Sequence, residues 1–92
     1  MNRKENYKEI KIDERTKIVC WGERERFCYT RRAELVQDGS VIAKTAANYY
    51  GGTREKYEYQ VVIRETIDRS NLENKQAVKE LIEKKLLKGA KQ

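Results

Sequence analysis

Residues 27–50 read FCYTRRAELVQDGSVIAKTAANYY, two long runs separated by Asp38-Gly39. An Asp-Gly pair favours a type I′ turn, because both central residues of that turn need a positive φ. We therefore expect a β-hairpin whose strands run from Phe27 to Gln37 and from Ser40 to Tyr50. Alternation gives the first strand two faces, one with Phe27, Tyr29, Arg31, Ala33 and Leu35, the other with Cys28, Thr30, Arg32, Glu34 and Val36.

Two shorter strands are expected before this hairpin. Residues 8–12, KEIKI, alternate with both isoleucines on one face, and residues 16–21 are β-branched and aromatic up to Gly22. Residues 13–15 are polar and suit the turn between the two strands. Residues 23–26, ERER, suit either a charged hairpin tip or an exposed strand end. Residues 1–7 are polar, and we expect them to form a flexible N-terminus.

The segment after the hairpin fits two patterns. Apolar or aromatic residues at 57, 59, 61 and 63 alternate as in a strand, whereas positions 59, 62, 63, 66 and 67 recur at helical spacing. Thr53 is a suitable N-cap, and the surrounding Glu and Lys are helix formers. We favour a helix from Thr53 to Ile67, with a strand as the alternative.

A second helix is expected at the C-terminal end. Residues 70–73, SNLE, form a capping-box sequence, in which Ser70 accepts from the Glu73 amide and Glu73 reaches back. Gly89 is a suitable C-terminal stop. The apolar stripe of this helix consists of Val78, Leu81, Ile82 and Leu86.

These elements predict an α+β fold, an antiparallel sheet of about four strands followed by one or two C-terminal helices. A single domain over residues 8–89 would contain them, with residues 90–92 as a tail. A chain of 92 residues buries only a thin core, so a homo-oligomer that shares its core is an alternative to a monomer.

The net charge of +6 suits an acidic partner such as DNA or RNA. Residues 1–36 and 54–92 each contain ten Lys or Arg and seven Asp or Glu, so the two signs are interleaved. One hypothesis is a sheet face on which arginines bind phosphates and aromatic rings stack on bases. The alternative is cross-strand pairing with glutamates. The candidate nucleic-acid-binding residues are Arg24, Arg26, Arg31, Arg32 and Lys44.

Residues 48–60, NYYGGTREKYEYQ, gather four of the six tyrosines around the only Gly-Gly pair. Tyrosine combines a flat apolar ring with a polar tip, which suits binding surfaces, although the rings can equally cover a small core. A helix starting at Thr53 would also offer free amides to an anion. The candidate partner-binding residues are Tyr49, Tyr50, Arg54, Tyr57, Tyr59 and Trp21, the last of which can instead be a core anchor.

Catalysis is not expected, because the chain has no histidine and no motif positions another acid or base. Two cysteines and no histidine cannot form a closed zinc site in one chain without carboxylates, and we expect no metal and no cofactor. Cys20 and Cys28 can face each other across a hairpin at residues 22–26, but reduced, buried thiols are the favoured state. No apolar run is long enough to span a membrane, and residues 1–8 lack a signal-peptide pattern. We therefore expect a cytoplasmic protein without a membrane partner.

The segment 44–60, KTAANYYGGTREKYEYQ, resembles a stretch of small accessory proteins of phages and conjugative elements. In those proteins a strand ends in Tyr-Tyr and a short turn leads to Thr-x-Glu-x-Tyr-x-Tyr-Gln, with an aromatic residue where this chain has Arg54. The resemblance implies an origin in a mobile element of a bacterial host more than any one activity, because many such proteins bind host defence complexes or DNA. The small size, the lack of catalytic groups and the mix of aromatic residues and arginines favour a non-enzymatic protein that inhibits or modulates a host defence protein or nucleoprotein complex. The alternatives are a small DNA- or RNA-binding protein and an oligomeric small-ligand-binding protein.

Overall fold

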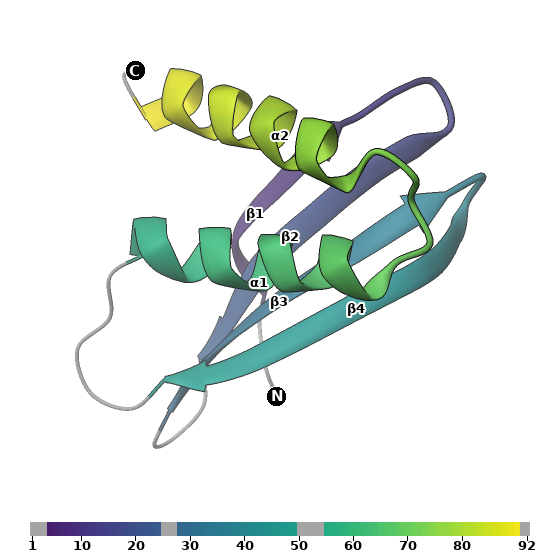
Figure 1. Cartoon of the computed structure of the whole chain (residues 1–92). Coiled ribbons are helices and arrows are strands. Elements are labelled where there is room, and N and C mark those ends of the chain that lie inside the picture. The colour runs from purple at the N-terminus through teal and green to yellow at the C-terminus, as the bar shows by residue number, and fades with distance from the viewer. Residues whose placement is uncertain (1–3, 25–27, 50–54, 91–92) are drawn as a thin grey trace.

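The computed structural model describes residues 4–24, 28–49 and 55–90. Four strands are followed by two helices: β1 (Lys4–Lys11), β2 (Thr16–Arg24), β3 (Tyr29–Gln37), β4 (Ser40–Tyr49), α1 (Glu55–Arg69) and α2 (Lys75–Ala90). The strands form one antiparallel sheet in the order β1-β2-β3-β4, and both helices lie on the same face of it (Figure 1). The predicted α+β fold is confirmed, and residues 55–69 form a helix rather than a strand.

The β3–β4 hairpin follows the turn chemistry of Asp38-Gly39. Both residues have positive φ, 52° for Asp38 and 81° for Gly39, and Gln37 pairs with Ser40. The return strand is irregular near its start. Leu35 pairs with Ala43 but Val36 pairs with Val41, so β4 has one extra residue at that point. From Ala43 to Tyr49 the register is regular.

β1 begins at Lys4 rather than at Lys8, because two contacts hold its first residues to the rest of the molecule. The Tyr59 hydroxyl donates to the Asn6 carbonyl oxygen at 2.8 Å, and Arg24 pairs with Glu5 at 3.4 Å. The register with β2 shifts between Glu5 and Lys8, where Asn6 has a φ of 54°. The sequence pattern missed this part of β1 because the irregularity interrupts the alternation.

The core lies between the sheet and the helices. α1 packs across β2, β3 and β4, and the pairs Arg64–Glu83 and Lys79–Asp68 join it to α2 at 2.7 and 2.6 Å. The predicted stripe of α2 contributes Ile82, which is 1% exposed, with Val78 and Leu86 packed beside it. The buried cluster consists of Ile10, Ile18, Cys20, Ala33, Leu35, Tyr59, Val62, Ile63, Ile67 and Ile82.

The predicted capping box does not start α2. The Ser70 hydroxyl donates to the Ile67 carbonyl oxygen at 2.6 Å and accepts from the Leu72 amide at 3.3 Å, so Ser70 closes the end of α1. α2 starts later, at Lys75, where the Val78 amide donates to the Asn74 carbonyl oxygen at 3.0 Å. Gly89 does not stop the helix either, because α2 continues to Ala90.

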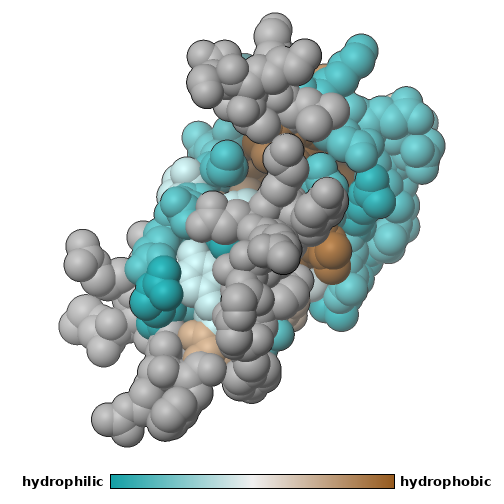
Figure 2. Space-filling view, turned by 90° about the vertical axis from the view of Figure 1, so that its left-hand side faces the viewer, coloured by the Kyte–Doolittle hydropathy of each residue, from teal (hydrophilic) through white to brown (hydrophobic). Residues whose placement is uncertain are grey.

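Large apolar side chains are exposed at only a few separate places among the described residues. On the side of the molecule shown in Figure 2, the described surface is mostly hydrophilic, with small separate hydrophobic areas. The exposed large apolar or aromatic side chains are Tyr7, Val41, Ile42 and Val61. Among the described residues, no helix has both the length and the apolar character needed to cross a membrane.

Candidate functional site

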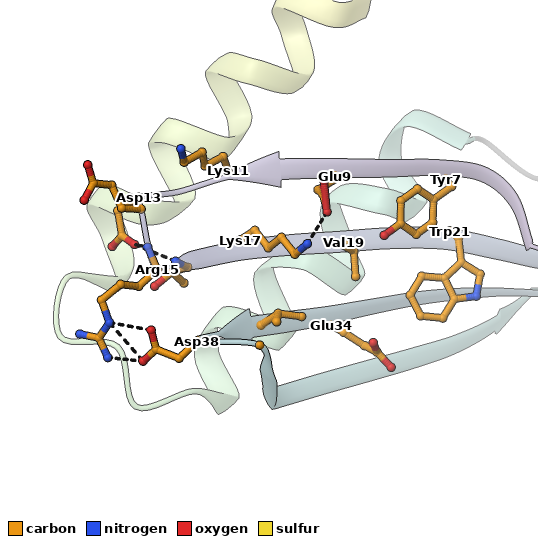
Figure 3. A pocket seen from close by; sticks show the side chains of 14 residues that line it. Tyr7, Glu9, Lys11, Asp13, Arg15, Lys17, Val19, Trp21, Glu34 and Asp38 are labelled. Atoms are coloured by element: carbon orange, nitrogen blue, oxygen red, sulfur yellow. Dashed lines mark hydrogen bonds and ion pairs between the residues drawn. The ribbon is translucent and has the colours of Figure 1, made fainter.

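One face of the sheet packs against the helices, and no helix of the described residues lies over the opposite face (Figures 1 and 3). Alternation along each strand sends every second side chain to this second face, which we call the open face. Its residues come from all four strands: Tyr7, Glu9, Lys11, Lys17, Val19, Trp21, Glu23, Thr30, Arg32, Glu34, Val36, Lys44, Ala46 and Asn48.

A groove of about 610 Å³ lies on the part of the open face formed by β1, β2 and β3 (Figure 3). Tyr7 and Trp21 lie at one end, and the turns at Asp13–Arg15 and Asp38-Gly39 lie at the other. Its floor includes Val19 and Val36, and most of its other lining residues are charged. Pockets for small ligands are usually mostly apolar. The charged lining of this groove therefore suits contact with a polar or mixed surface of a partner better than binding of an apolar small molecule.

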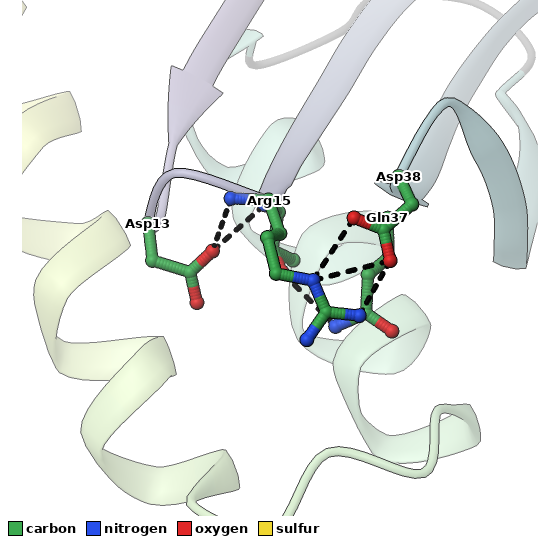
Figure 4. Close-up of polar contacts among 5 residues, drawn as sticks. Asp13, Arg15, Gln37 and Asp38 are labelled. Atoms are coloured by element: carbon green, nitrogen blue, oxygen red, sulfur yellow. Dashed lines mark hydrogen bonds and ion pairs between the residues drawn. The ribbon is translucent and has the colours of Figure 1, made fainter.

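Two turns are joined at the far end of the groove (Figure 4). The Arg15 Nε donates to both carboxylate oxygens of Asp38, at 2.9 and 3.1 Å, and Arg15 Nη2 also pairs with Asp38. The Asp13 carboxylate accepts from the Arg15 and Thr16 amides, both at 2.8 Å, which stabilises the first turn. The Arg15 amide holds the pKa of Asp13 below its usual value, and the Arg15 guanidinium does the same for the pKa of Asp38.

Tyr7 and Trp21 form an aromatic pair at the other end. Their ring centroids are 6.2 Å apart with an interplanar angle of 26°. Trp21 is only 4% exposed, whereas Tyr7 is 52% exposed, so Tyr7 presents the accessible part of the pair. Glu23 holds the Trp21 and Arg32 side chains in place, because its carboxylate accepts hydrogen bonds from Trp21 Nε1 at 3.0 Å and from Arg32 Nε at 2.9 Å.

The charges of the open face are largely paired with one another. Lys17 binds Glu9 at 2.6 Å, which raises the pKa of Lys17, and Arg32 binds Glu23. Among the open-face side chains that the structure describes, four are basic (Lys11, Lys17, Arg32 and Lys44) and three are acidic (Glu9, Glu23 and Glu34). The groove lining contains three basic residues (Lys11, Arg15 and Lys17) and five acidic ones (Glu9, Asp13, Glu14, Glu34 and Asp38). The positive excess of the chain is therefore not concentrated in the groove.

The candidate arginines do not share one surface. Arg31 is 0% exposed on the helix-covered face, where its guanidinium lies 4.3 Å from the Tyr29 ring centroid and 4.4 Å from that of Tyr59. Arg24 pairs with Tyr29 in the register, so it faces the helix side and lies on the opposite face from Arg32. Arg32 and Lys44 lie on the open face, and Arg26 lies outside the described residues.

The candidate aromatic residues separate in the same way. Tyr59 is 4% exposed in the core, where its hydroxyl binds the Asn6 carbonyl oxygen, so it is not an accessible binding residue. Trp21 is the candidate that lies on the open face. Tyr50 and Arg54 lie outside the described residues, as do the side chains of Tyr49 and Tyr57.

The cysteines form no disulfide. Cys20 pairs with Ala33 in the β2–β3 register, and Cys28 precedes β3, so the two do not face each other across the hairpin. Burial raises the pKa of the Cys20 thiol to about 11, which keeps it protonated at neutral pH. Within the described ranges, no group of three or more Cys, Asp or Glu side chains has a geometry that could hold a metal ion.

Sequence reasoning missed Tyr7 and Glu23 as members of the site. Tyr7 was assigned to a flexible segment, yet its position has the same parity as Glu9 and the opposite parity to Ile10. That parity places Tyr7 on the face away from the core once β1 is known to extend to Lys4.

Comparison of the chain with protein-family models, curated proteins and solved structures finds no match.

Proposed function

We propose that this protein is a non-enzymatic binding module whose open face contacts another protein. The observation that supports this most strongly is the combination, on the open face, of the accessible Tyr7 ring, backed by the buried Trp21, with charges that are already paired with one another. Tyr7 is 52% exposed beside Trp21, and the neighbouring basic residues Lys17 and Arg32 are bound to Glu9 and Glu23. Aromatic residues are enriched at protein interfaces, where they anchor a patch within a polar rim.

The charge distribution argues for a protein partner over a nucleic acid. A phosphate-binding face needs basic side chains that are free to displace counterions, whereas two of the four basic side chains described on the open face are in ion pairs. Arg31, which the nucleic-acid hypothesis needs on the surface, is inside the core. Binding through such a mixed face should also persist at moderate salt, because screening weakens exposed charge pairs more than aromatic contacts.

The partner class comes from the resemblance of residues 44–60 to phage and conjugative-element accessory proteins. We propose a host defence protein or nucleoprotein complex as the partner, which the module inhibits or modulates by occupying a surface. Inhibition by occupation needs no catalytic group in the module itself. It requires a rigid surface, and a four-stranded sheet backed by two helices provides one.

The experiment is affinity capture with three proteins: wild type, Tyr7→Ala and Val61→Ala. Val61 lies on α1 and is 51% exposed, so its truncation removes a comparably exposed apolar side chain from the opposite layer of the molecule. We expect Tyr7→Ala to lose the partner and Val61→Ala to keep it, in low and moderate salt alike. Equal capture by both variants would contradict the assignment of the open face.

A parallel titration with fluorescent single- and double-stranded DNA and RNA separates the two functions. We expect at most weak binding at low salt that disappears near physiological ionic strength, as for non-specific contacts of a basic protein. Tight binding that Arg32→Ala abolishes would instead favour the nucleic-acid function.

A further inference from the structure

The two edges of the sheet differ in how they are protected. The β1 edge has an irregularity at Asn6 and five charged residues in its sequence KENYKEIK, and both features discourage another strand from pairing with it. The β4 edge, SVIAKTAANY, contains Lys44 as its single charge and no proline. A long and weakly charged edge strand of this kind is a ready template for strand addition.

The outward backbone groups of β4 can be assigned. Arg69 Nη1 on α1 donates to the Lys44 carbonyl oxygen at 3.3 Å, so this carbonyl points away from β3. In an antiparallel strand the N–H and C=O of one residue point the same way and alternate along the chain. Lys44, Ala46 and Asn48 therefore present their amides outward. In the part of the chain that the structure describes, no strand pairs with this side of β4.

We propose that β4 pairs with β4 of a second copy of this chain, antiparallel and about a two-fold axis. The regular part of β4 runs from Ala43 to Tyr49, so full overlap of the two copies places Ala46 on the axis. In this register Lys44 lies opposite the second copy's Asn48, whose backbone amide replaces Arg69 Nη1 as the donor to the Lys44 carbonyl oxygen. The charged Lys44 side chain thus lies opposite the neutral Asn48 side chain and not opposite Lys44 of the second copy. At the two-fold axis the small Ala46 side chain lies opposite Ala46 of the second copy.

Burial of the neighbouring side chains agrees with this pairing. Ala33 in the interior strand β3 is 0% exposed, whereas Ala43 and Ala47 on β4 are only half-buried beneath α1. A second copy would cover their remaining exposed area and form one continuous eight-stranded sheet with both open faces on the same side. An interface made mainly of one strand pair is small, so we expect a dissociation constant on the order of micromolar.

The first test measures molar mass in solution from micromolar to submillimolar protein. We expect the wild type to rise from the chain mass of 10.9 kDa toward twice that value. Ala46→Lys and Ala46→Glu should each stay at the single-chain mass, because like charges meet at the axis. An equimolar mixture of the two variants should recover the dimer. Gln76→Lys on the exposed part of α2 adds the same charge as Ala46→Lys and should dimerise like the wild type.

The second test uses amide hydrogen exchange of the wild type and needs no variant. In the dimer the outward amides of Lys44, Ala46 and Asn48 should exchange more slowly as protein concentration rises. The amides of Ala43, Thr45 and Ala47 point toward β3 and should be protected at every concentration. A wild type that keeps the single-chain mass throughout, or a dimer whose three outward amides stay unprotected, would overturn the proposal. Neither readout depends on the proposed function.

Discussion

The two faces of the sheet use the same strands for different purposes. On the covered face, Ile18, Cys20, Ala33 and Leu35 are all 0% exposed, and even a cation, Arg31, is enclosed between two tyrosine rings. On the open face, charged residues pair with one another around a groove, and Tyr7 remains accessible. Charge in this sequence therefore does not mark the surface by itself. The parity of a residue along its strand decides which face of the sheet it joins.

The largest expected contrast is between the neighbours Leu35 and Val36. Leu35→Ala leaves a cavity in the core and should lower the free energy of unfolding by about 2–5 kcal/mol. Val36→Ala removes a half-buried side chain from the groove floor and should cost about 1 kcal/mol or less. Urea denaturation of both variants measures the difference. Equal losses would mean that the open face is as tightly packed as the covered one.

A second contrast compares Arg31 with Arg32. Arg31→Ala removes two desolvated cation–π contacts, each of about 2 kcal/mol, and should strongly destabilise the fold. Arg32→Ala breaks a partly exposed ion pair with Glu23 and should cost less than about 1 kcal/mol. Thermal unfolding followed by circular dichroism measures both. A stable Arg31→Ala variant would contradict the enclosed position of this side chain.

The sequence predicted most of the fold because its strongest local signals agreed with one another. The Asp38-Gly39 turn, the alternation of β3 and the helical spacing of residues 59–67 all have direct counterparts in the structure. It predicted less of the site. The irregularity at Asn6 hid the start of β1 and with it Tyr7, and no local pattern reveals that α1 covers Arg31 but not Arg32. Ser70 was misassigned because a capping-box sequence fits equally the end of one helix and the start of the next.

The smallest expected effect concerns the joined turns beside the groove. The folded-state pKa of Asp38 lies below its unfolded value of about 3.9, so its stabilising contribution is present above that pH. The contribution is lost as the pH falls through the folded-state pKa. Asp38→Asn keeps a residue that tolerates positive φ but removes the charge. Its urea midpoint should fall slightly below that of the wild type at neutral pH, and the two should converge in acid. A gap that is unchanged at low pH would contradict the role of the Arg15–Asp38 pair.

Whether a partner occupies the open face can be measured by photo-crosslinking. A photo-crosslinking amino acid is placed at position 7 or, in a matched protein, at position 61, and the adducts formed with the partner are compared. Both positions are about half exposed, but they lie on opposite layers of the molecule. We expect a specific adduct from position 7 that the unlabelled wild type competes away, and none from position 61. A specific adduct from position 61 alone would place the binding surface on the helices and rule out the open face.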